Sequence, residues 1–229
     1  GLEKKLKKKN KAIYLLFLMP FVYFATACFV VWLVKTSGIY PSGSDTMYHV
    51  YRGDYVYNAI KSGNWYPLYN PAWYNGVEIL RYWSPFPAYV MAFCQYLAGG
   101  SQFGAYLFYI GGVCFLGACV WPFIGRGFNR PYLGAFIGLL WFFMPNNLCA
   151  IFIEGNLARS LSMIFLPVFI YSVYKYLYNH KLRYIPLMVF TFLLMELCHL
   201  GYAGMVAIAV IIYGIVYMIQ KGRKKAVLD

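Results

Sequence analysis

The first candidates for chemistry are Asp45, His49 and Arg52, which follow one another at steps of four and three residues. Residues at these spacings share one face of a helix, and the pattern of the chain predicts an amphipathic helix over 45–62. Asp45 could act as a general base or hold a divalent cation, His49 could orient it, and Arg52 could contact a substrate. A plainer interpretation is that Asp45 is a first-turn acid favoured by the helix dipole and that His49 only satisfies a hydrogen bond.

Two further pairs of ionisable residues occur later in the chain. Glu154 and Arg159 are five residues apart in a short loop, where they could form an ordinary interfacial ion pair or serve a reaction. Glu196 and His199 are three apart on one predicted helical face, within or at the edge of an apolar run. Because ionisable groups are costly in hydrocarbon, this second pair is either a structural pair or part of a functional site.

The polar segment 36–83 is rich in tyrosine and tryptophan and contains no phenylalanine. Such amphipathic rings suit the level of the lipid headgroups, which is the plainer interpretation. Alternatively, they form a platform for a carbohydrate or a lipid headgroup, with asparagine side chains adding hydrogen bonds. The candidate substrate-binding residues of this segment are Trp65, Trp73, Tyr74, Asn75 and Arg81.

The composition indicates the environment in which these residues act. The chain has 229 residues, of which 62% are hydrophobic and only 12% charged, yet its net charge is +13. The charge lies in short clusters between long apolar runs, which is typical of a polytopic membrane protein and excludes a nucleic-acid-binding surface. The six cysteines lack the paired spacing of a zinc site, so no metal centre is predicted from them. The expected partner is therefore the lipid bilayer.

Apolar runs of about 20 residues are long enough to span a bilayer. They predict an all-α polytopic fold of about six transmembrane helices, over 13–35, 103–124, 132–152, 160–178, 184–198 and 201–220. The last two come from one long run that is interrupted near His199. We expect residues 1–229 to form a single transmembrane module, the N-terminal part of a longer protein, with 36–83 as its first outer loop. No cleavable signal peptide is expected, because the first apolar run is too long for one.

The basic clusters decide whether the shorter apolar segment 84–99 also crosses the membrane. If it did, with the lysine-rich N-terminus in the cytoplasm, the later basic clusters would lie outside, against the positive-inside rule. A re-entrant or interfacial helix over 84–99 returns all of these clusters to the cytoplasm. This arrangement predicts a plasma-membrane protein with both termini of the segment cytoplasmic and the candidate site on the extracytoplasmic face.

Three motifs, taken in order, resemble those of a known family. They are Gly43-Ser44-Asp45-Thr46-Met47-Tyr48-His49, Asn70-Pro71-Ala72-Trp73-Tyr74-Asn75-Gly76 and Glu154-Gly155-Asn156-Leu157-Ala158-Arg159. Over nearly its whole length the chain resembles bacterial membrane proteins described as related to 6-pyruvoyl-tetrahydropterin synthase. Its layout is also similar to the N-terminal module of GT-C superfamily glycosyltransferases.

The GT-C resemblance implies a glycosyltransferase-like protein that uses a polyprenyl-phosphate-linked sugar as donor and a glycan as acceptor. In that family an essential acid lies in the first outer loop, which Asp45 matches, and another often lies in the second, where Glu154 stands. The chain departs from the family pattern there. Glu154 and Gly155 precede Arg159, whereas the family pattern has an Arg-Gly pair followed by an acid.

The same resemblance implies roles for the remaining candidates. Arg159, or alternatively Arg81, would stabilise the polyprenyl phosphate leaving group, and Glu196 and His199 would shape the acceptor pocket. Two other functions remain as alternatives. One is a non-catalytic membrane protein that binds a lipid-linked glycan, and the other is a proton-coupled transporter with Glu196 and His199 as its relay.

Overall fold

The structure is a computed structural model that describes the backbone of residues 2–228 and the side chains of residue 14 and residues 16–221. Over residues 2–228 the fold is all-α, as predicted, with one isolated antiparallel bridge between Asn70 and Val77. The α-helices are α1 (Leu2–Ser37), α2 (Thr46–Lys61), α3 (Phe86–Leu97), α4 (Gln102–Gly127), α5 (Pro131–Trp141), α6 (Pro145–Leu148), α7 (Leu157–Asn179), α8 (Ile185–Cys198) and α9 (Leu200–Leu228). A π-helical turn, η1 (Cys149–Ile153), follows α6, and a 3₁₀ turn, η2 (Leu182–Tyr184), precedes α8.

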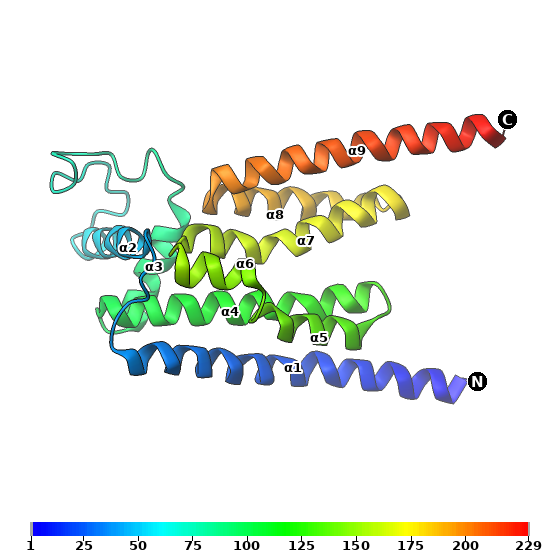
Figure 1. The fold of residues 1–229 in the computed structure, drawn as a ribbon, viewed down its shortest axis with the longest axis horizontal. Helices are drawn as coiled ribbons and strands as arrows, with labels where there is room; N and C mark the ends of the chain where they lie inside the picture. Colours follow the sequence, from blue (N-terminus) through cyan, green and yellow to red (C-terminus); the bar gives the residue numbers. More distant parts are fainter. Residues whose placement is uncertain (1, 229) are drawn as a thin grey trace.

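The helices form an elongated bundle with two distinct ends (Figure 1). We call the end that carries α2, α3 and residues 62–85 the loop end, and the opposite end, where α1 begins and α9 finishes, the terminal end. Between these ends the chain passes along the bundle in α1, α4, the broken segment Pro131–Ile153, α7, α8 and α9. The start of α1 and the end of α9 therefore lie at the same end of the bundle.

Five of these passes are long and apolar enough to cross a bilayer: Leu16–Ser37, Gln102–Gly127, Pro131–Ile153, Leu157–Asn179 and Leu200–Lys221. The remaining pass, α8, has 14 residues and is therefore about 21 Å long, less than the hydrocarbon thickness of about 30 Å. The polytopic membrane fold is confirmed, while a sixth crossing stays a prediction.

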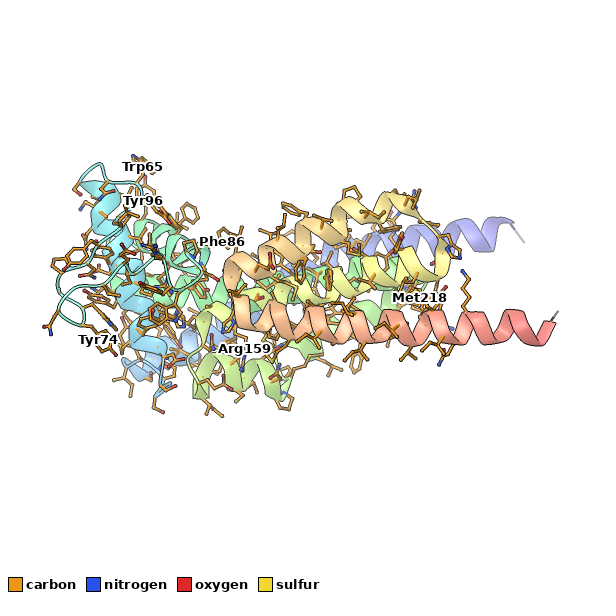
Figure 2. All side chains as sticks on the ribbon, turned by 90° about the horizontal axis from the view of Figure 1, so that it is seen from above. Trp65, Tyr74, Phe86, Tyr96, Arg159 and Met218 are labelled. Atoms are coloured by element: carbon orange, nitrogen blue, oxygen red, sulfur yellow. The ribbon has the colours of Figure 1, made fainter. Side chains whose placement is uncertain are left out.

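Two helices at the loop end, α2 and α3, are not passes of the bundle. Where the sequence predicts a helix over 45–62 the structure has α2, and Figure 2 shows it lying across the bundle direction. The second, α3, has 12 residues and packs against α2 and α4. At about 18 Å it is too short to cross a bilayer, which agrees with the prediction that 84–99 is not a span.

The acidic residues are concentrated at the loop end. All five whose side chains the structure describes lie on α2, on the segments next to it or at the near end of α8: Asp45, Asp54, Glu78, Glu154 and Glu196. Basic residues occur at both ends: Lys35, Arg52, Lys61, Arg81 and Arg159 at the loop end, and Arg126, Arg130, Lys175, Lys181, Arg183 and Lys221 at the terminal end. Among the described side chains the acids offset the basic residues at the loop end, whereas the terminal end is purely basic, as the positive-inside rule expects of a cytoplasmic end. The membrane side that each end faces stays a prediction.

Close helix packing brings the later passes together around a shared core. A Cβ atom on Gly125 of α4 would lie 2.6 Å from the Cα atom of Gly134 on α5, so these helices approach at their backbones. After α5 the chain breaks before Pro145 and continues through η1, a type of turn that is often found at functional sites. This irregular path delivers Glu154 to the loop end, beside the start of α2.

Candidate functional site

The start of α2 is bound to the loop between η1 and α7. The Asp45 backbone N–H donates to the Glu154 carbonyl oxygen at 3.0 Å, and the Ser44 hydroxyl donates to the same oxygen at 3.0 Å. These two segments of the chain meet at glycines, since a Cβ atom on Gly43 would lie 2.6 Å from the Cα atom of Gly155. Gly155 itself has a φ of +67°, which favours glycine. The position of Asp45 therefore depends on a contact between residues more than 100 positions apart.

Replacing Gly155 by alanine is expected to destabilise the protein more than the same change at Gly99. The φ angles are +67° at Gly155 and +65° at Gly99, so backbone strain is matched at about 1–2 kcal/mol. A Cβ atom at Gly155 would also lie 2.6 Å from the Thr46 nitrogen, whereas nothing lies within 4 Å at Gly99. Overpacking costs about 1–3 kcal/mol more, which thermal unfolding in detergent would measure. Equal losses for the two variants would contradict the tight contact between α2 and Gly155.

The Asp45 carboxylate is free to meet a substrate. Asp45 is the N-cap residue of α2, but its side chain makes no capping hydrogen bond and is exposed. Its one polar contact among the described side chains is with the Ser44 hydroxyl, which donates to Oδ1 at 3.2 Å. A capping bond therefore does not explain the acid here, although the helix dipole still favours an acid at the N-cap, as the plainer interpretation expects.

Glu154 and Arg159 form the ion pair that the sequence left open. Arg159 Nη1 lies 2.8 Å from Glu154 Oε2, and the Cys149 thiol donates to Glu154 Oε1 at 3.4 Å. The hydrogen bond from Arg159 lowers the pKa of Glu154, so this carboxylate is ionised at neutral pH. Arg159 stands in the first turn of α7, where the helix dipole disfavours a cation. Its Nε is buried and has no hydrogen-bond partner among the described residues. Helix stability alone does not favour arginine at this position.

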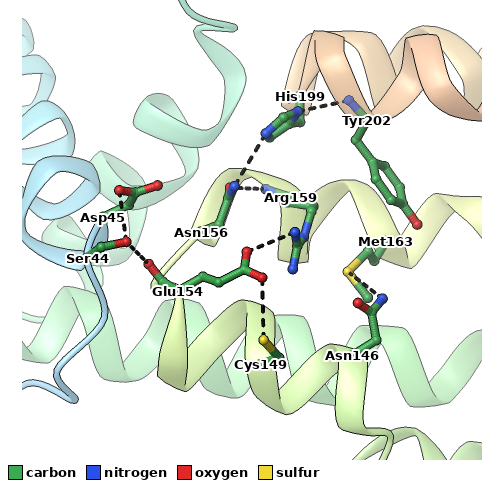
Figure 3. A network of polar contacts seen from close by, with 10 residues as sticks. All are labelled: Ser44, Asp45, Asn146, Cys149, Glu154, Asn156, Arg159, Met163, His199 and Tyr202. Atoms are coloured by element: carbon green, nitrogen blue, oxygen red, sulfur yellow. Dashed lines mark hydrogen bonds and ion pairs between the residues drawn. The ribbon is translucent and has the colours of Figure 1, made fainter.

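Asn156 and His199 place two hydrogen-bond donors beside this pair (Figure 3). The Asn156 Oδ1 accepts from the Arg159 backbone N–H at 3.0 Å, and its Nδ2 lies on the side of His199. His199 Nδ1 accepts from the Tyr202 backbone N–H at 3.0 Å, so the neutral ring carries its proton on Nε2. Nδ2 and Nε2 lie 3.4 Å apart, and because both are then donors they can share an acceptor better than they can bond to each other.

His49 and Arg52 lie beneath the exposed Asp45 rather than beside it at the surface. Burial, and then the nearby charge of Arg52, lowers the pKa of His49 to about 3, so the imidazole is neutral at ordinary pH. Arg52 is 2% exposed, and its guanidinium donates to the carbonyl oxygens of Ile79, Trp83 and Ser84 at 3.3–3.4 Å. These contacts fix the 79–84 segment over α2.

An aromatic cluster covers the same part of α2. The Trp73 ring lies 4.6 Å from Tyr51, 5.3 Å from Tyr48 and 5.7 Å from Tyr74, as centroid distances. Tyr48 also contacts the rings of His49 and Trp83. The cluster therefore continues from the buried His49 to Tyr74, which is 84% exposed.

Several candidate residues lie outside this arrangement. The Trp65 side chain is exposed, and its carbonyl oxygen accepts from the Tyr89 hydroxyl. Asn75 occupies a turn with φ +60°, and Arg81 pairs at 2.6 Å with Glu78 on the surface. Glu196 accepts from the Ser84 hydroxyl through its carbonyl oxygen, not its side chain.

The prediction that Glu196 and His199 share a helical face is wrong. Helix α8 ends at Cys198, and His199 is extended at φ −156°, with its ring turned to the first turn of α9 and to Asn156. The two side chains form no pair, so the structure offers no support for a proton relay between them.

The site also includes residues that sequence reasoning did not select, chiefly Asn156 and Ser44. Asn156 caps α7, and an asparagine directly before a long apolar helix is a signal that could have identified it. For a divalent cation at Asp45 the surroundings do not fit. The carboxylate of Glu154, whose backbone contacts Ser44 and Asp45, is already bonded to Arg159. No group of three His, Cys, Asp or Glu residues gathers within the described part of the chain.

Comparison with known proteins gave one family. Residues 80–229 match the family described as 6-pyruvoyl-tetrahydropterin synthase related domain, membrane protein. The matched region contains Glu154, Arg159 and His199, whereas Asp45 precedes it, so the resemblance over nearly the whole chain is found for this part only. The comparisons with curated proteins and with solved structures found no match.

Proposed function

The chain belongs to the 6-pyruvoyl-tetrahydropterin synthase related family of membrane proteins, and we propose that it is a GT-C-like glycosyltransferase or part of one. It would transfer a sugar from a polyprenyl-phosphate donor to a hydroxyl of a glycan acceptor. The reaction would take place at the extracytoplasmic face of a bacterial plasma membrane, which the loop end would face, with both termini of the segment in the cytoplasm.

The observation that carries this proposal is an exposed carboxylate next to an array of donors. Asp45 is linked through Ser44 to the Glu154 backbone, and Glu154 holds Arg159, which neighbours Asn156 and His199 (Figure 3). A base and an anion-binding group on one surface are what transfer to a hydroxyl with a phosphate leaving group requires.

In the proposed reaction, Asp45 accepts the proton of the acceptor hydroxyl as its oxygen attacks C1 of the donor sugar. The bond between C1 and the phosphate oxygen breaks, and its electron pair leaves on the polyprenyl phosphate. The Arg159 guanidinium, the Asn156 amide and His199 Nε2–H would bind that phosphate, since guanidinium hydrogen bonds to phosphate are strong and directional. Asp45 is the catalytic base of this proposal.

Other residues support these groups. The contacts of Glu154 favour a positioning role, holding Arg159 and the start of α2, over the catalytic role that the sequence predicts. His49 and Arg52 would shape the floor of the site from beneath. The cluster around Trp73 would offer ring faces to a sugar.

Trp65, Asn75, Arg81 and Glu196 stay candidates for the more distant parts of the substrates. None of these four side chains is joined to the network of Asp45 and Arg159 by a hydrogen bond or ion pair within the described structure.

The test is a reconstitution of the full-length protein in liposomes with a radiolabelled sugar attached to polyprenyl phosphate. We expect release of polyprenyl phosphate, slow with water as acceptor and fast with a suitable glycan. A parallel reaction with a nucleotide sugar should show no turnover. Binding of the lipid-linked sugar without any turnover would instead support a non-catalytic glycan-binding protein, and turnover of the nucleotide sugar alone would contradict the proposal.

A further inference from the structure

A large apolar groove lies on the side of the bundle formed by α1, α3 and α4. Its volume is about 910 Å³, and α4 packs against both of the other helices. The α1 wall is a stripe at helical spacing, Phe24, Ala27, Cys28, Val31, Trp32 and Lys35. The α4 wall includes Gly104, Gly111 and Gly112, and at Gly112 the missing side chain leaves open space. The residues of the proposed transferase site do not line it.

The depth of the groove corresponds to one leaflet of a bilayer. From Lys35 to Phe24 the α1 wall has a rise of about 16 Å, calculated from 1.5 Å per residue. Half of the hydrocarbon core is about 15 Å thick. A lipid with ordinary acyl chains would therefore fill the groove from its mouth to its inner end, whereas a long polyprenyl chain would extend beyond it.

The mouth of the groove carries one cation, Lys35. Lys35 lies in the last turn of α1 at the loop end, and no ion pair holds its side chain among the described residues. Ser101, the N-cap of α4, also lines the groove, but the C-terminal ends of α1 and α3 lie at the same mouth, so the helix dipoles oppose one another there. Lys35 is therefore the group that favours an anion. Apart from Lys35 and Ser101 the lining is almost wholly apolar.

We propose that this groove is a binding site for an anionic phospholipid of the leaflet next to the loop end. The acyl chains lie along α1 and α4, and the phosphate lies near Lys35 and the start of α4. The inference does not depend on the proposed transferase activity, because it concerns a different face of the bundle.

Gly112 offers a position at which the groove can be filled. Nothing lies within 4 Å of a Cβ atom built on Gly112, so leucine there would occupy lipid volume and would also favour the helix. Gly204 on α9 is likewise open and exposed but lies outside the groove, which makes Gly204→Leu a matched control.

The test uses the full chain in nanodiscs of equal parts phosphatidylglycerol and phosphatidylcholine, followed by native mass spectrometry of retained lipid. We expect the unmodified protein to retain phosphatidylglycerol preferentially and Gly204→Leu to match it, while Gly112→Leu loses most of the retained lipid of both kinds. Lys35→Gln, a change at an exposed position, should lower the preference for phosphatidylglycerol about fivefold. Lys61→Gln, at an exposed lysine of α2 outside the groove, should not lower it.

Equal lipid retention by the Gly112→Leu and Gly204→Leu variants would overturn the site. An unchanged preference in Lys35→Gln would overturn the role of the cation. Displacement of phosphatidylglycerol by an equimolar amount of polyprenyl phosphate would overturn the assignment of the groove to a bilayer phospholipid.

Discussion

Replacing Asp45 by asparagine is expected to lower sugar transfer from a polyprenyl-phosphate donor by about 10²–10⁴-fold, the usual contribution of a positioned general base. Asparagine has the same shape but cannot accept the acceptor hydroxyl's proton. Because the side chain is exposed and makes no capping bond to α2, the change should leave folding and membrane insertion intact. The measurement is the initial rate of polyprenyl phosphate release in liposomes, alongside the thermal unfolding midpoint.

Asp54→Asn is the matched control for this prediction. Asp54 also belongs to α2, but its Oδ1 accepts from Gln95 Nε2 at 2.7 Å, on the side of the helix that packs against α3. An asparagine oxygen can still accept that bond, so this variant should keep near-normal turnover. Retained turnover in Asp45→Asn would exclude Asp45 as the base, and equal losses in both variants would indicate a general effect on α2 rather than chemistry.

Much of the fold follows from local patterns. Apolar runs predicted the five spans to within about three residues at each end, and the interruption near His199 predicted the boundary between α8 and α9. They did not predict that α1 begins before its apolar run, that α9 continues past its own, or that the chain between 132 and 152 is broken after α5. That boundary is physically simple, because the imidazole of His199 bonds to the third residue of α9 and so caps a new helix. The sequence did not show that the break also separates Glu196 from His199. Because His199 is extended, its side chain does not lie on the face of α8 that carries Glu196, as it would in a continuous helix.

Features of the site that depend on contacts between distant parts of the sequence were not predicted. Asp45, His49 and Arg52 share a helical spacing, yet His49 and Arg52 are buried whereas Asp45 is exposed. For Arg52 the difference arises because the 79–84 segment folds back over α2 and accepts its hydrogen bonds. Helical spacing alone does not predict that contact. The contact of Gly43 with Gly155 is equally hidden, because it joins two loops whose approach is decided by the packing of α4, α5 and α7.

Arg159 is the second residue whose replacement should have a large effect. Arg159→Gln is expected to lower the rate of transfer by about 10²–10³-fold, as the loss of a donor that stabilises a developing anion does elsewhere. The loss should fall mainly on kcat, because phosphate charge increases as the C1–O bond breaks and the guanidinium contacts it most strongly in the transition state. Arg159→Lys should recover part of the rate, since it keeps the charge without the planar fork.

A structural role for Arg159 would produce a different pattern. Its pair with Glu154 holds the loop that contacts α2, so a purely structural loss would be reproduced by Glu154→Gln and would be insensitive to the leaving group. The proposal instead expects Glu154→Gln to be milder than Arg159→Gln. It also expects the deficit of Arg159→Gln to shrink with a sugar linked through polyprenyl pyrophosphate, whose leaving group needs less stabilisation. If the deficit is the same for both donors, Arg159 acts through the fold, and Asn156 and His199 become the leading candidates for binding the phosphate.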